Sequence, residues 1–417
     1  MKKGKALFVC GFSLMQNSSV TFQNRLIIKG LKKLGFSVDV VCPEPEKESP
    51  VYDESLQDIL DYIDQIYYIP SSTLYRAYLK LFSAKKQFPI TSSSNESSLF
   101  SKTKKLVKNW TFNFFNFIDL DGSLRLSTGS TRKINLKMNE YEILISSSDP
   151  KCAHLIAKKL IHYSRGRKPF WIQYWGDPWF EDVTLRGNWK KPIIYFLEKN
   201  ILSHAEKIVY ASPITLKKQM ELFPDYANKM SYANQASEIE IDNSCNEFEA
   251  DIVPTIAYFG DYNTRFRNIL PFYNASDLFQ NARFLIVGTS NLNLKNKNNM
   301  KVINQRLGYD NIKKLEQKTH IFFAVCNSYG TQIPAKIYYW AGYRKKPIVV
   351  AVDGEYKDDI RNFLKGFGRY IICENTIESI IDGINKALQV WKSGVTYSVP
   401  YELTYEGMVK KIIERKF

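Results

Sequence analysis

The feature of the sequence that most constrains the fold is the alternation of short apolar runs with segments of helical spacing. Residues 6–10 form an apolar run, and after a polar loop residues 25–35 repeat leucine and isoleucine at the spacing of one helix face. Gly35 ends this predicted helix, and FSVDVVCP follows as a second buried strand. Such a strand, helix, strand unit requires a right-handed crossover. It builds an open parallel sheet, which binds ligands at the carboxyl ends of its strands.

The alternation continues in two series, which predicts two domains. In the first series the apolar runs are YEILISSS, FWIQYW and KIVYASP, and in the second they are TIAYFGD, RFLIVGT, HIFFAVC, KPIVVAV and RYIICE. Residues 239–252 between them are acidic and polar and indicate a linker. A chain of 417 residues is also too long for one compact core. We therefore expect an α/β protein with Rossmann-like domains at residues 1–238 and 252–395.

Two segments stand outside this alternation. Residues 83–137 form an insertion in the first domain, and within it residues 107–118 place apolar and aromatic side chains on one predicted helix face. This helix either packs on the sheet or, with the lysines just before it, lies on an anionic membrane surface. Residues 396–417 form a C-terminal helical segment, which in a two-lobed protein can cross back to the N-terminal domain.

The net charge of +16 indicates an anionic partner. Nucleic acids, acidic membrane surfaces and phosphorylated small molecules all fit this charge. The sequence contains no zinc-finger spacing, RRM-type aromatic motif or helix-turn-helix pattern, so we do not expect nucleic acid as the partner. Phosphorylated small molecules and an anionic membrane surface both stay open.

The cysteines and histidines do not indicate a metal centre or a disulfide framework. The six cysteines are scattered without a C-x-x-C pair, as expected for buried, reduced thiols of a cytoplasmic protein. They are Cys10, Cys42, Cys152, Cys245, Cys326 and Cys373. The four histidines are equally dispersed, so we expect no bound metal.

The N-terminal sequence MKKGKALFVCGFSLM has basic residues before an apolar run, as a signal peptide does. It lacks a small-residue cleavage site, and the run ends at the turn residues Gly11 and Ser13, which favours a buried first strand. No run approaches the ~20 apolar residues needed to span a bilayer. We expect a cytoplasmic protein that is soluble or attached peripherally to the inner face of the cell membrane.

The segment TQIPAKIYYWAGYRKKPIVVA is the most specific signal in the second series. Pro334 suits the first turn of a helix, where its missing N–H is harmless, and the residues before it leave N–H groups pointing outward. A helix start beside a strand end is a natural phosphate site. An ordinary helix start is the alternative interpretation.

The segment YFGDYNTRFRNILPF ends the first strand of the second series. Gly260 allows the backbone to approach a ligand closely, and Arg265 and Arg267 can place their guanidinium groups on a diphosphate. Solvated loop arginines are the alternative. The presence of both segments in one predicted domain favours a phosphate site.

Several segments resemble those of bacterial GT-B glycosyltransferases related to family 4. They are ILISSSDPKCAHLIAKKL, WIQYWGDPW, EKIVYASPITLKKQM, YFGDYNTRFRN and IPAKIYYWAGYRKKPIVVA, in the family's order and over most of the chain except residues 83–137. The resemblance implies two Rossmann-like domains that face each other across a cleft. It also implies a nucleotide-sugar donor in the C-terminal domain and an acceptor in the N-terminal domain.

By this resemblance the donor-binding residues are Gly260, Arg265, Arg267, Thr331, Gln332, Ile333, Lys336 and Tyr339. Family enzymes usually carry two glutamates separated by seven residues, and the second grips the ribose. Thr331 and Tyr339 occupy these two places in this chain. A tyrosine does not accept two ribose hydroxyl hydrogen bonds as a carboxylate does, so the donor's identity and the transfer mechanism stay open.

The resemblance places the acceptor site in the N-terminal domain. Asp177, in the segment GDPW, either binds or deprotonates the acceptor hydroxyl or serves as a turn and cap residue. His154, at a helix start, is either a second catalytic residue or a structural one. The residues implied for acceptor binding are Gly11, Ser18, Trp175 and Asn234.

Together these observations predict transfer of a glycosyl group from a nucleoside-diphosphate sugar to a hydroxyl, with no cofactor or metal. Basic residues and a helix start would stabilise the departing diphosphate. The acceptor implied by the resemblance is a carbohydrate or lipid-linked saccharide of surface polysaccharide or glycolipid biosynthesis. Two alternatives are a sugar-nucleotide epimerase of the same fold and an inactive subunit that binds nucleotide sugars.

Overall fold

The computed structural model describes residues 4–47, 49, 51–73, 75–76, 126, 131, 134, 136–182, 189–237 and 252–415. The predicted helix face at residues 107–118 and most of the insertion at 83–137 lie outside these residues. The predicted linker, apart from residue 252, and Cys245 also lie outside them.

The first sheet has seven strands in the order β3-β2-β1-β4-β5-β6-β7. They are β1 Lys5–Cys10, β2 Ser37–Pro43, β3 Gln65–Ile69, β4 Tyr141–Ser148, β5 Phe170–Trp175, β6 Lys207–Tyr210 and β7 Met230–Tyr232. Strand β1 pairs in parallel with β2 and with β4, so the strand order reverses between β1 and β4, as in a Rossmann fold. Every residue of β1 after Lys5 is buried, which is typical of a parallel strand covered on both faces.

Helices follow the strands of this sheet, namely α1 Ser19–Lys33, α4 Cys152–Tyr163, α5 Lys191–Ser203 and α6 Pro213–Leu222. Helix α6 begins where the sequence supplies two helix-start signals. Ser212 Oγ accepts the backbone N–H of Thr215 at 3.1 Å, and Pro213 occupies the first turn. Ser212 and Thr215 also contact Thr331 of the second series.

The second sheet has six strands in the order β10-β9-β8-β11-β12-β13. They are β8 Thr255–Phe259, β9 Arg283–Val287, β10 Met300–Ile303, β11 Ile321–Val325, β12 Ile348–Val352 and β13 Ile371–Glu374. The helices are α7 Leu270–Ala275, α8 Tyr309–Lys318, α9 Ala335–Trp340, α10 Lys357–Lys365 and α11 Ile377–Lys392. Strand β8 pairs in parallel with β9 and β11, so this sheet also reverses its order at the middle.

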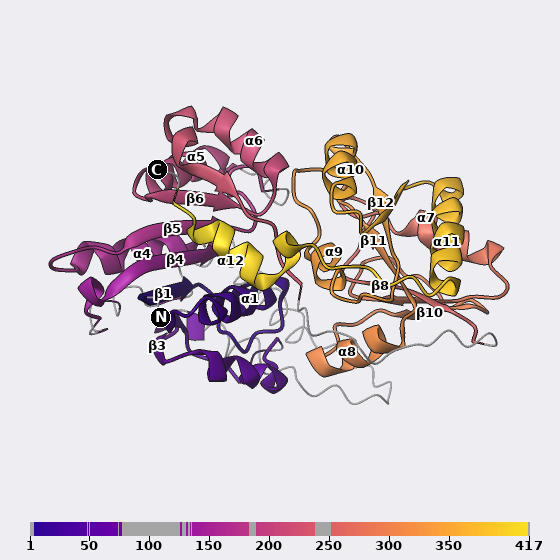
Figure 1. Ribbon diagram of the computed structural model, residues 1–417, viewed down its shortest axis with the longest axis horizontal. Coiled ribbons are helices and arrows are strands. Elements are labelled where there is room, and N and C mark those ends of the chain that lie inside the picture. The colour runs from indigo at the N-terminus through magenta and orange to yellow at the C-terminus, as the bar shows by residue number, and fades with distance from the viewer. Residues whose placement is uncertain are drawn as a thin grey trace, which may run out of the picture. The chain divides into compact units, whose positions relative to one another are not determined.

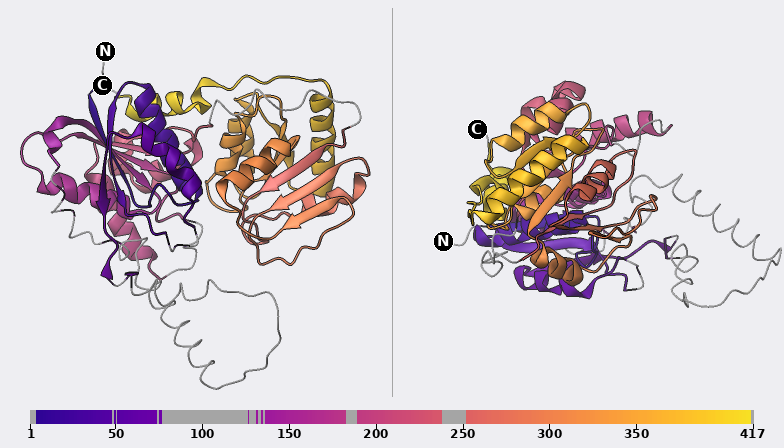
Figure 2. Two further views of the ribbon diagram at one scale, coloured as in Figure 1. Left: turned by 90° about the horizontal axis from the view of Figure 1, so that it is seen from below. Right: turned by 90° about the vertical axis from the view of Figure 1, so that its right-hand side faces the viewer.

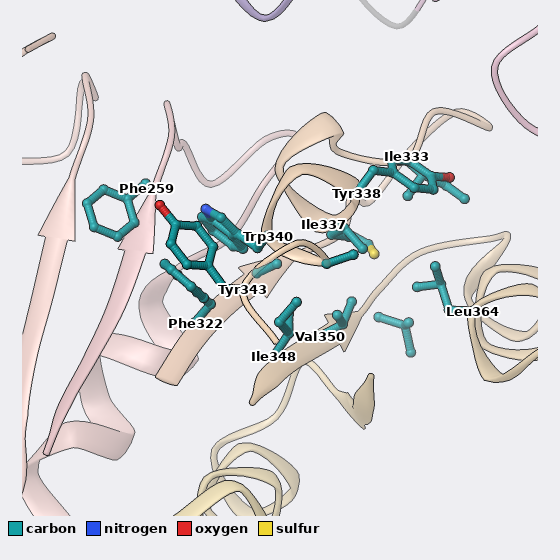
Figure 3. Close-up of a cluster of buried hydrophobic side chains, with 14 of the residues drawn as sticks. Phe259, Phe322, Ile333, Ile337, Tyr338, Trp340, Tyr343, Ile348, Val350 and Leu364 are labelled. Atoms are coloured by element: carbon teal, nitrogen blue, oxygen red, sulfur yellow. The ribbon is translucent and has the colours of Figure 1, made fainter. Parts of the chain in front are cut away.

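Helices cover both faces of the second sheet (Figure 1). Phe259 and Phe322 belong to a buried cluster on the face covered by α9 and α10. Their strand neighbours Tyr258 and Phe323 belong to a cluster under α7 and α11 on the other face. In Figure 3 the ring of Trp340 lies against that of Phe322, with centroids 4.7 Å apart and planes 10° from parallel. This stacking anchors α9 on the centre of the sheet.

By the density of their contacts the residues form two compact units, Met1–Asn24 with Gly35–Gln173 and Arg25–Leu34 with Tyr174–Phe417. Within the second unit, the C-terminal helix α12 Tyr405–Ile413 packs against α1 (Figure 2). A Cβ atom on Gly30 would overlap the carbonyl oxygen of Tyr405 and the side chain of Val409. Lys207 Nζ donates to the carbonyl oxygens of Lys411 at 3.0 Å and Glu414 at 2.6 Å, so a positive charge caps the carboxyl end of α12.

Candidate functional site

The carboxyl ends of β8 and β11 meet where the order of the second sheet reverses, the position at which open α/β sheets bind ligands. Gly260 follows β8 with a φ of 148°, a conformation that favours glycine. A Cβ atom at this position would lie 3.4 Å from the hydroxyl of Tyr258 and 3.9 Å from Nη1 of Arg267. Glycine therefore places no side chain beside this guanidinium.

The loop from Gly260 to Arg267 is held by its own hydrogen bonds. The backbones of Asn263 and Arg267 exchange two N–H to carbonyl hydrogen bonds, at 3.2 and 3.1 Å. Oδ1 of Asn263 also accepts the backbone N–H groups of Arg265 at 2.9 Å and Phe266 at 2.7 Å. The loop thus presents Arg267 from a fixed backbone.

Arg267 binds a neutral partner. Its Nε and Nη2 donate to Oδ1 of Asn327 at 3.1 and 2.8 Å, and its Nη1 lies 3.4 Å from the carbonyl oxygen of Asp261. Across the residues that the structure describes, Arg267 forms no ion pair with a carboxylate. The exposed Arg265 has its guanidinium carbon 5.1 Å from the ring centroid of Phe266. Of the two predicted arginines, Arg267 is therefore the one that side-chain hydrogen bonds orient here.

Asp261 directs its carboxylate to other groups. Oδ1 accepts the backbone N–H and the hydroxyl of Thr289 at 2.9 and 2.5 Å, and Oδ2 pairs with Arg306 at 2.9 Å. Burial alone would raise the pKa of Asp261, but the Thr289 hydrogen bonds and the Arg306 charge outweigh it and hold the pKa below its ordinary value. Asp261 is therefore ionised at neutral pH, and its carboxylate binds Thr289 and Arg306 and not Arg267.

The residues predicted to cradle a phosphate before α9 are buried. Thr331, Gln332 and Ile333 expose 4%, 9% and 7% of their surface. Oγ1 of Thr215 donates to Oγ1 of Thr331 at 2.9 Å, so the start of α6 engages this hydroxyl within the second unit. The helix that follows begins at Ala335, after Pro334, and has six residues. The phosphate site at 331–333 stays a prediction.

Lys336, predicted to bind the donor, forms an ion pair and is partly exposed, so its donor role stays a prediction. Its Nζ is 3.3 Å from Oε1 of Glu316, which also accepts Nε1–H of Trp340 at 3.0 Å. Oε2 of Glu316 accepts the hydroxyl of Tyr343 at 3.1 Å. Burial alone would raise the pKa of Glu316, but the charges of Lys336 and Lys313 and the hydrogen bonds from Trp340 and Lys336 lower it to about 2. Tyr339, on the same helix, is partly exposed.

In the first unit, the structure gives Gly11 and Ser18 local structural roles. A Cβ atom on Gly11 would come within 2.7 Å of Cγ of Pro150 and 3.0 Å of Sγ of Cys152, so only glycine fits this close packing. Oγ of Ser18 accepts the backbone N–H of Thr21 at 3.2 Å and thereby caps the start of α1. Acceptor binding by these two residues stays a prediction.

His154 is fully buried at the start of α4. Its Nδ1 lies 2.8 Å from Oγ of Ser146, and that oxygen accepts Nε1–H of Trp171 at 2.9 Å. Burial and the nearby Lys151 charge lower the pKa of His154 well below its ordinary value, so its ring is neutral at pH 7. These observations favour the structural interpretation of His154 over the catalytic one.

The remaining predicted acceptor residues belong to the second unit. Trp175 is fully buried at the end of β5, with its ring centroid 6.4 Å from that of Tyr210. Asp177 lies partly exposed in the turn that follows, and Asn234 is 3% exposed after β7. Their roles toward an acceptor stay predictions.

Asn327 is the residue of this site that the sequence analysis missed. It stands two residues after β11, next to the switch point, and joins the two segments predicted to hold a diphosphate. The available signal was a polar residue directly after the buried run HIFFAVC. That signal does not distinguish Asn327 from other polar residues at strand ends.

The described ranges contain no group of three or more His, Cys, Asp or Glu residues that could hold a metal ion. Within the same part of the chain, no helix is long and apolar enough to cross a bilayer. The five described cysteines are buried and free, namely Cys10, Cys42, Cys152, Cys326 and Cys373.

No protein-family model matches the chain, and no curated protein matches it. Among solved structures, the chain is similar to a glycosyltransferase from Rickettsia africae ESF-5, with a TM-score of 0.50 and 14% identity over 99% of this chain and 94% of that one. It is also similar to the N-terminal domain of Candida albicans trehalose-6-phosphate phosphatase, with a TM-score of 0.52 and 10% identity over 99% and 93% of the two chains. With the two Rossmann-like sheets, these similarities confirm the α/β, GT-B fold class.

Proposed function

We propose that the chain is a glycosyltransferase that moves a sugar from a nucleoside-diphosphate sugar to a hydroxyl acceptor. The observation that carries this proposal is the Arg267 guanidinium, held beside Gly260 at the switch point of a Rossmann-like sheet. A fixed positive charge at this edge suits a diphosphate, whose negative charge grows as its bond to the sugar breaks. The similarity in fold to the Rickettsia africae glycosyltransferase supports this choice of reaction.

Binding of nucleoside diphosphates tests the donor half of the proposal. We expect Arg267→Ala to weaken the best binder among the uridine, adenosine, guanosine and cytidine 5′-diphosphates about 10- to 100-fold in calorimetry. A hydrogen bond to a charged group contributes about 1.5–3 kcal/mol, which corresponds to this range. The matched control is Arg283→Ala, an exposed arginine at the opposite, amino end of β9. Equal affinity of the wild type and Arg267→Ala would reject the donor assignment.

Product analysis tests the reaction itself. The protein is incubated with a labelled sugar nucleotide, first alone and then with a lipid-linked saccharide. A labelled glycoside formed only with the acceptor supports transfer. An epimerised sugar nucleotide formed without acceptor would identify an epimerase, and binding without any product would identify an inactive subunit.

We further propose that the acceptor is a carbohydrate or lipid-linked saccharide and that Asp177 binds or deprotonates its hydroxyl. The partly exposed position of Asp177 directly after β5 supports this role, because ligands bind at the carboxyl ends of such strands. The net charge of +16 supports an additional, peripheral contact with an anionic membrane surface at the cytoplasmic face. The helix face at residues 107–118 that would make this contact lies outside the described residues.

A further inference from the structure

Asn327 lies where the loop after β8 meets the end of β11. We propose that Asn327 is a positioning residue, which orients the Arg267 guanidinium toward an anionic diphosphate without cancelling its charge. This inference rests on the proposed function: Asn327 would hold Arg267 in the donor site while the guanidinium keeps its positive charge.

Two N–H groups of Arg267 share one acceptor oxygen of Asn327. Oδ1 of Asn327 accepts from both Nε and Nη2 of Arg267, at 3.1 and 2.8 Å, which fixes the plane of the guanidinium. The adjoining backbones are also joined, because Ser328 donates its N–H to the carbonyl oxygen of Phe266 at 2.7 Å. On its other side, Nδ2 of Asn327 lies 3.5 Å from the carbonyl oxygen of Gln332. Asn327 thus connects the two segments predicted to hold the diphosphate.

The partner of Arg267 is an amide, where a carboxylate would form a salt bridge and neutralise the guanidinium. The two aspartates at this edge of the sheet bind other groups. Asp261 pairs with Arg306, and Asp353 accepts the backbone N–H of Gly354 at 2.8 Å and Nδ2–H of Asn375 at 3.0 Å. The positive charge of Arg267 therefore stays uncompensated by any carboxylate that the structure describes within ion-pair distance.

Arg267 also retains hydrogen-bond donors. A guanidinium has five N–H groups, and the contacts with Asn327 and Asp261 engage one each on Nε, Nη2 and Nη1. The hydroxyl of Tyr258 also accepts a hydrogen bond from Arg267. The N–H groups that these partners leave lie on the Nη1 and Nη2 edge of the guanidinium, which is the edge that binds phosphate oxygens. Gly260 places no side chain beside Nη1.

Two substitutions at Asn327 separate orientation from charge. Asn327→Asp keeps an oxygen acceptor and adds a negative charge, so we expect nucleoside-diphosphate affinity to fall at least about tenfold, toward that of Arg267→Ala, with an unchanged or higher Tm. Asn327→Ala removes the acceptor without adding charge, and we expect an affinity loss of about 3- to 10-fold. The matched control is Asn304→Asp, because Asn304 accepts a backbone N–H from Ser290 at 2.9 Å and does not contact Arg267. We expect its affinity to change less than about threefold, since an exposed charge without direct contact is screened.

The outcomes distinguish this inference from the proposed function. If the wild type binds none of the four nucleoside diphosphates, the proposed function fails and the role of Asn327 fails with it. If Arg267→Ala weakens binding but both Asn327 variants keep the wild-type Kd, only the positioning role is refuted. A loss of Tm in both Asn327 variants with an unchanged Kd would likewise assign Asn327 a purely structural role. If Asn327→Ala does not fold, Asn327→Asp decides, because it retains the acceptor.

Discussion

Replacement of Glu316 by glutamine removes one buried negative charge while nearly keeping the shape of the side chain. The wild-type carboxylate is 4% exposed, pairs with Lys336 at 3.3 Å and lies 3.7 Å from Lys313. It also accepts hydrogen bonds from Trp340 and Tyr343, which flank the end of α9. In the variant, the lysine charges would lose their compensation, and an amide N–H would face one of these donors.

The size of the effect follows from the pKa of Glu316, which is about 2 in the folded protein against an ordinary value of 4.5. A difference of about 2.5 units corresponds to about 3 kcal/mol in the free energy of unfolding. Because the folded pKa is the lower one, this contribution is complete above pH 4.5 and is lost as the pH falls toward 2. At pH 3 we expect about 1 kcal/mol to remain.

Urea denaturation of the wild type and Glu316→Gln at pH 7 and pH 3 measures this difference. We expect the variant to be about 3 kcal/mol less stable at pH 7 and about 1 kcal/mol less stable at pH 3. Glu221→Gln is the control, because Glu221 is 58% exposed and its 3.8 Å pair with Lys218 should contribute less than about 1 kcal/mol. An equal loss at both pH values would show that packing, not charge, accounts for the effect of Glu316.

Two further predictions concern a buried histidine and a glycine. Nδ1 of His320 accepts the backbone N–H of Thr255 at 2.9 Å, and burial, with a smaller effect of the Lys346 charge, lowers the pKa of His320 to about 4. Because the folded protein holds the His320 ring neutral, the stabilisation from this ring is complete above pH 6.5 and is lost as the pH falls toward 4. Replacement of His320 by glutamine should therefore remove about 2–3 kcal/mol of the fall in unfolding free energy between pH 7 and pH 4.5. An unaltered fall would contradict this prediction. Gly288→Ala should lower the free energy of unfolding by about 2 kcal/mol or more, because its φ of 157° favours glycine and its Cβ would overlap the carbonyl oxygen of Gly260. Gly394→Ala, with a φ of 67° and open space around the Cβ, has only the milder strain of the left-handed helical region, so we expect it to lose less stability than Gly288→Ala; an equal loss of Tm in both variants would contradict the predicted cost at Gly288.

The strands that the sequence predicted are mostly those buried on both faces. The run HIFFAVC contains β11, whose five residues are all buried. A continuous apolar run of this kind is typical of a central parallel strand. Strands β3, β7 and β10 were not predicted. Each lies at an edge of its sheet and has exposed or half-buried positions, so it lacks a continuous apolar run. Edge strands are defined by their neighbours as much as by their own residues.

The candidate site was predictable only as far as local sequence determines it. Gly260 and Arg267 are seven residues apart, and the loop between them is closed by its own hydrogen bonds. Asn327 is 60 residues from Arg267, and Glu316 is 20 from Lys336. The pairing of these side chains depends on the strand order and on how α8 and α9 pack, which no spacing in the sequence encodes. For that reason the sequence did not predict the ion pair of Lys336 with Glu316, while the donor-binding role of Lys336 stays a prediction.

The close contact of α12 with Gly30 has a consequence for the order of folding during synthesis. Gly30 lies in the first helix of the chain, yet the atoms that pack against it belong to Tyr405 and Val409. The ribosome adds residues at about 5–20 per second, so at least about 20 seconds pass between the synthesis of Gly30 and that of Tyr405 and Val409. Throughout this interval the nascent chain would expose the α1 surface at Gly30 to other proteins. Contacts of such wide sequence separation also slow folding, because the loop-closure entropy is lost before the contact forms.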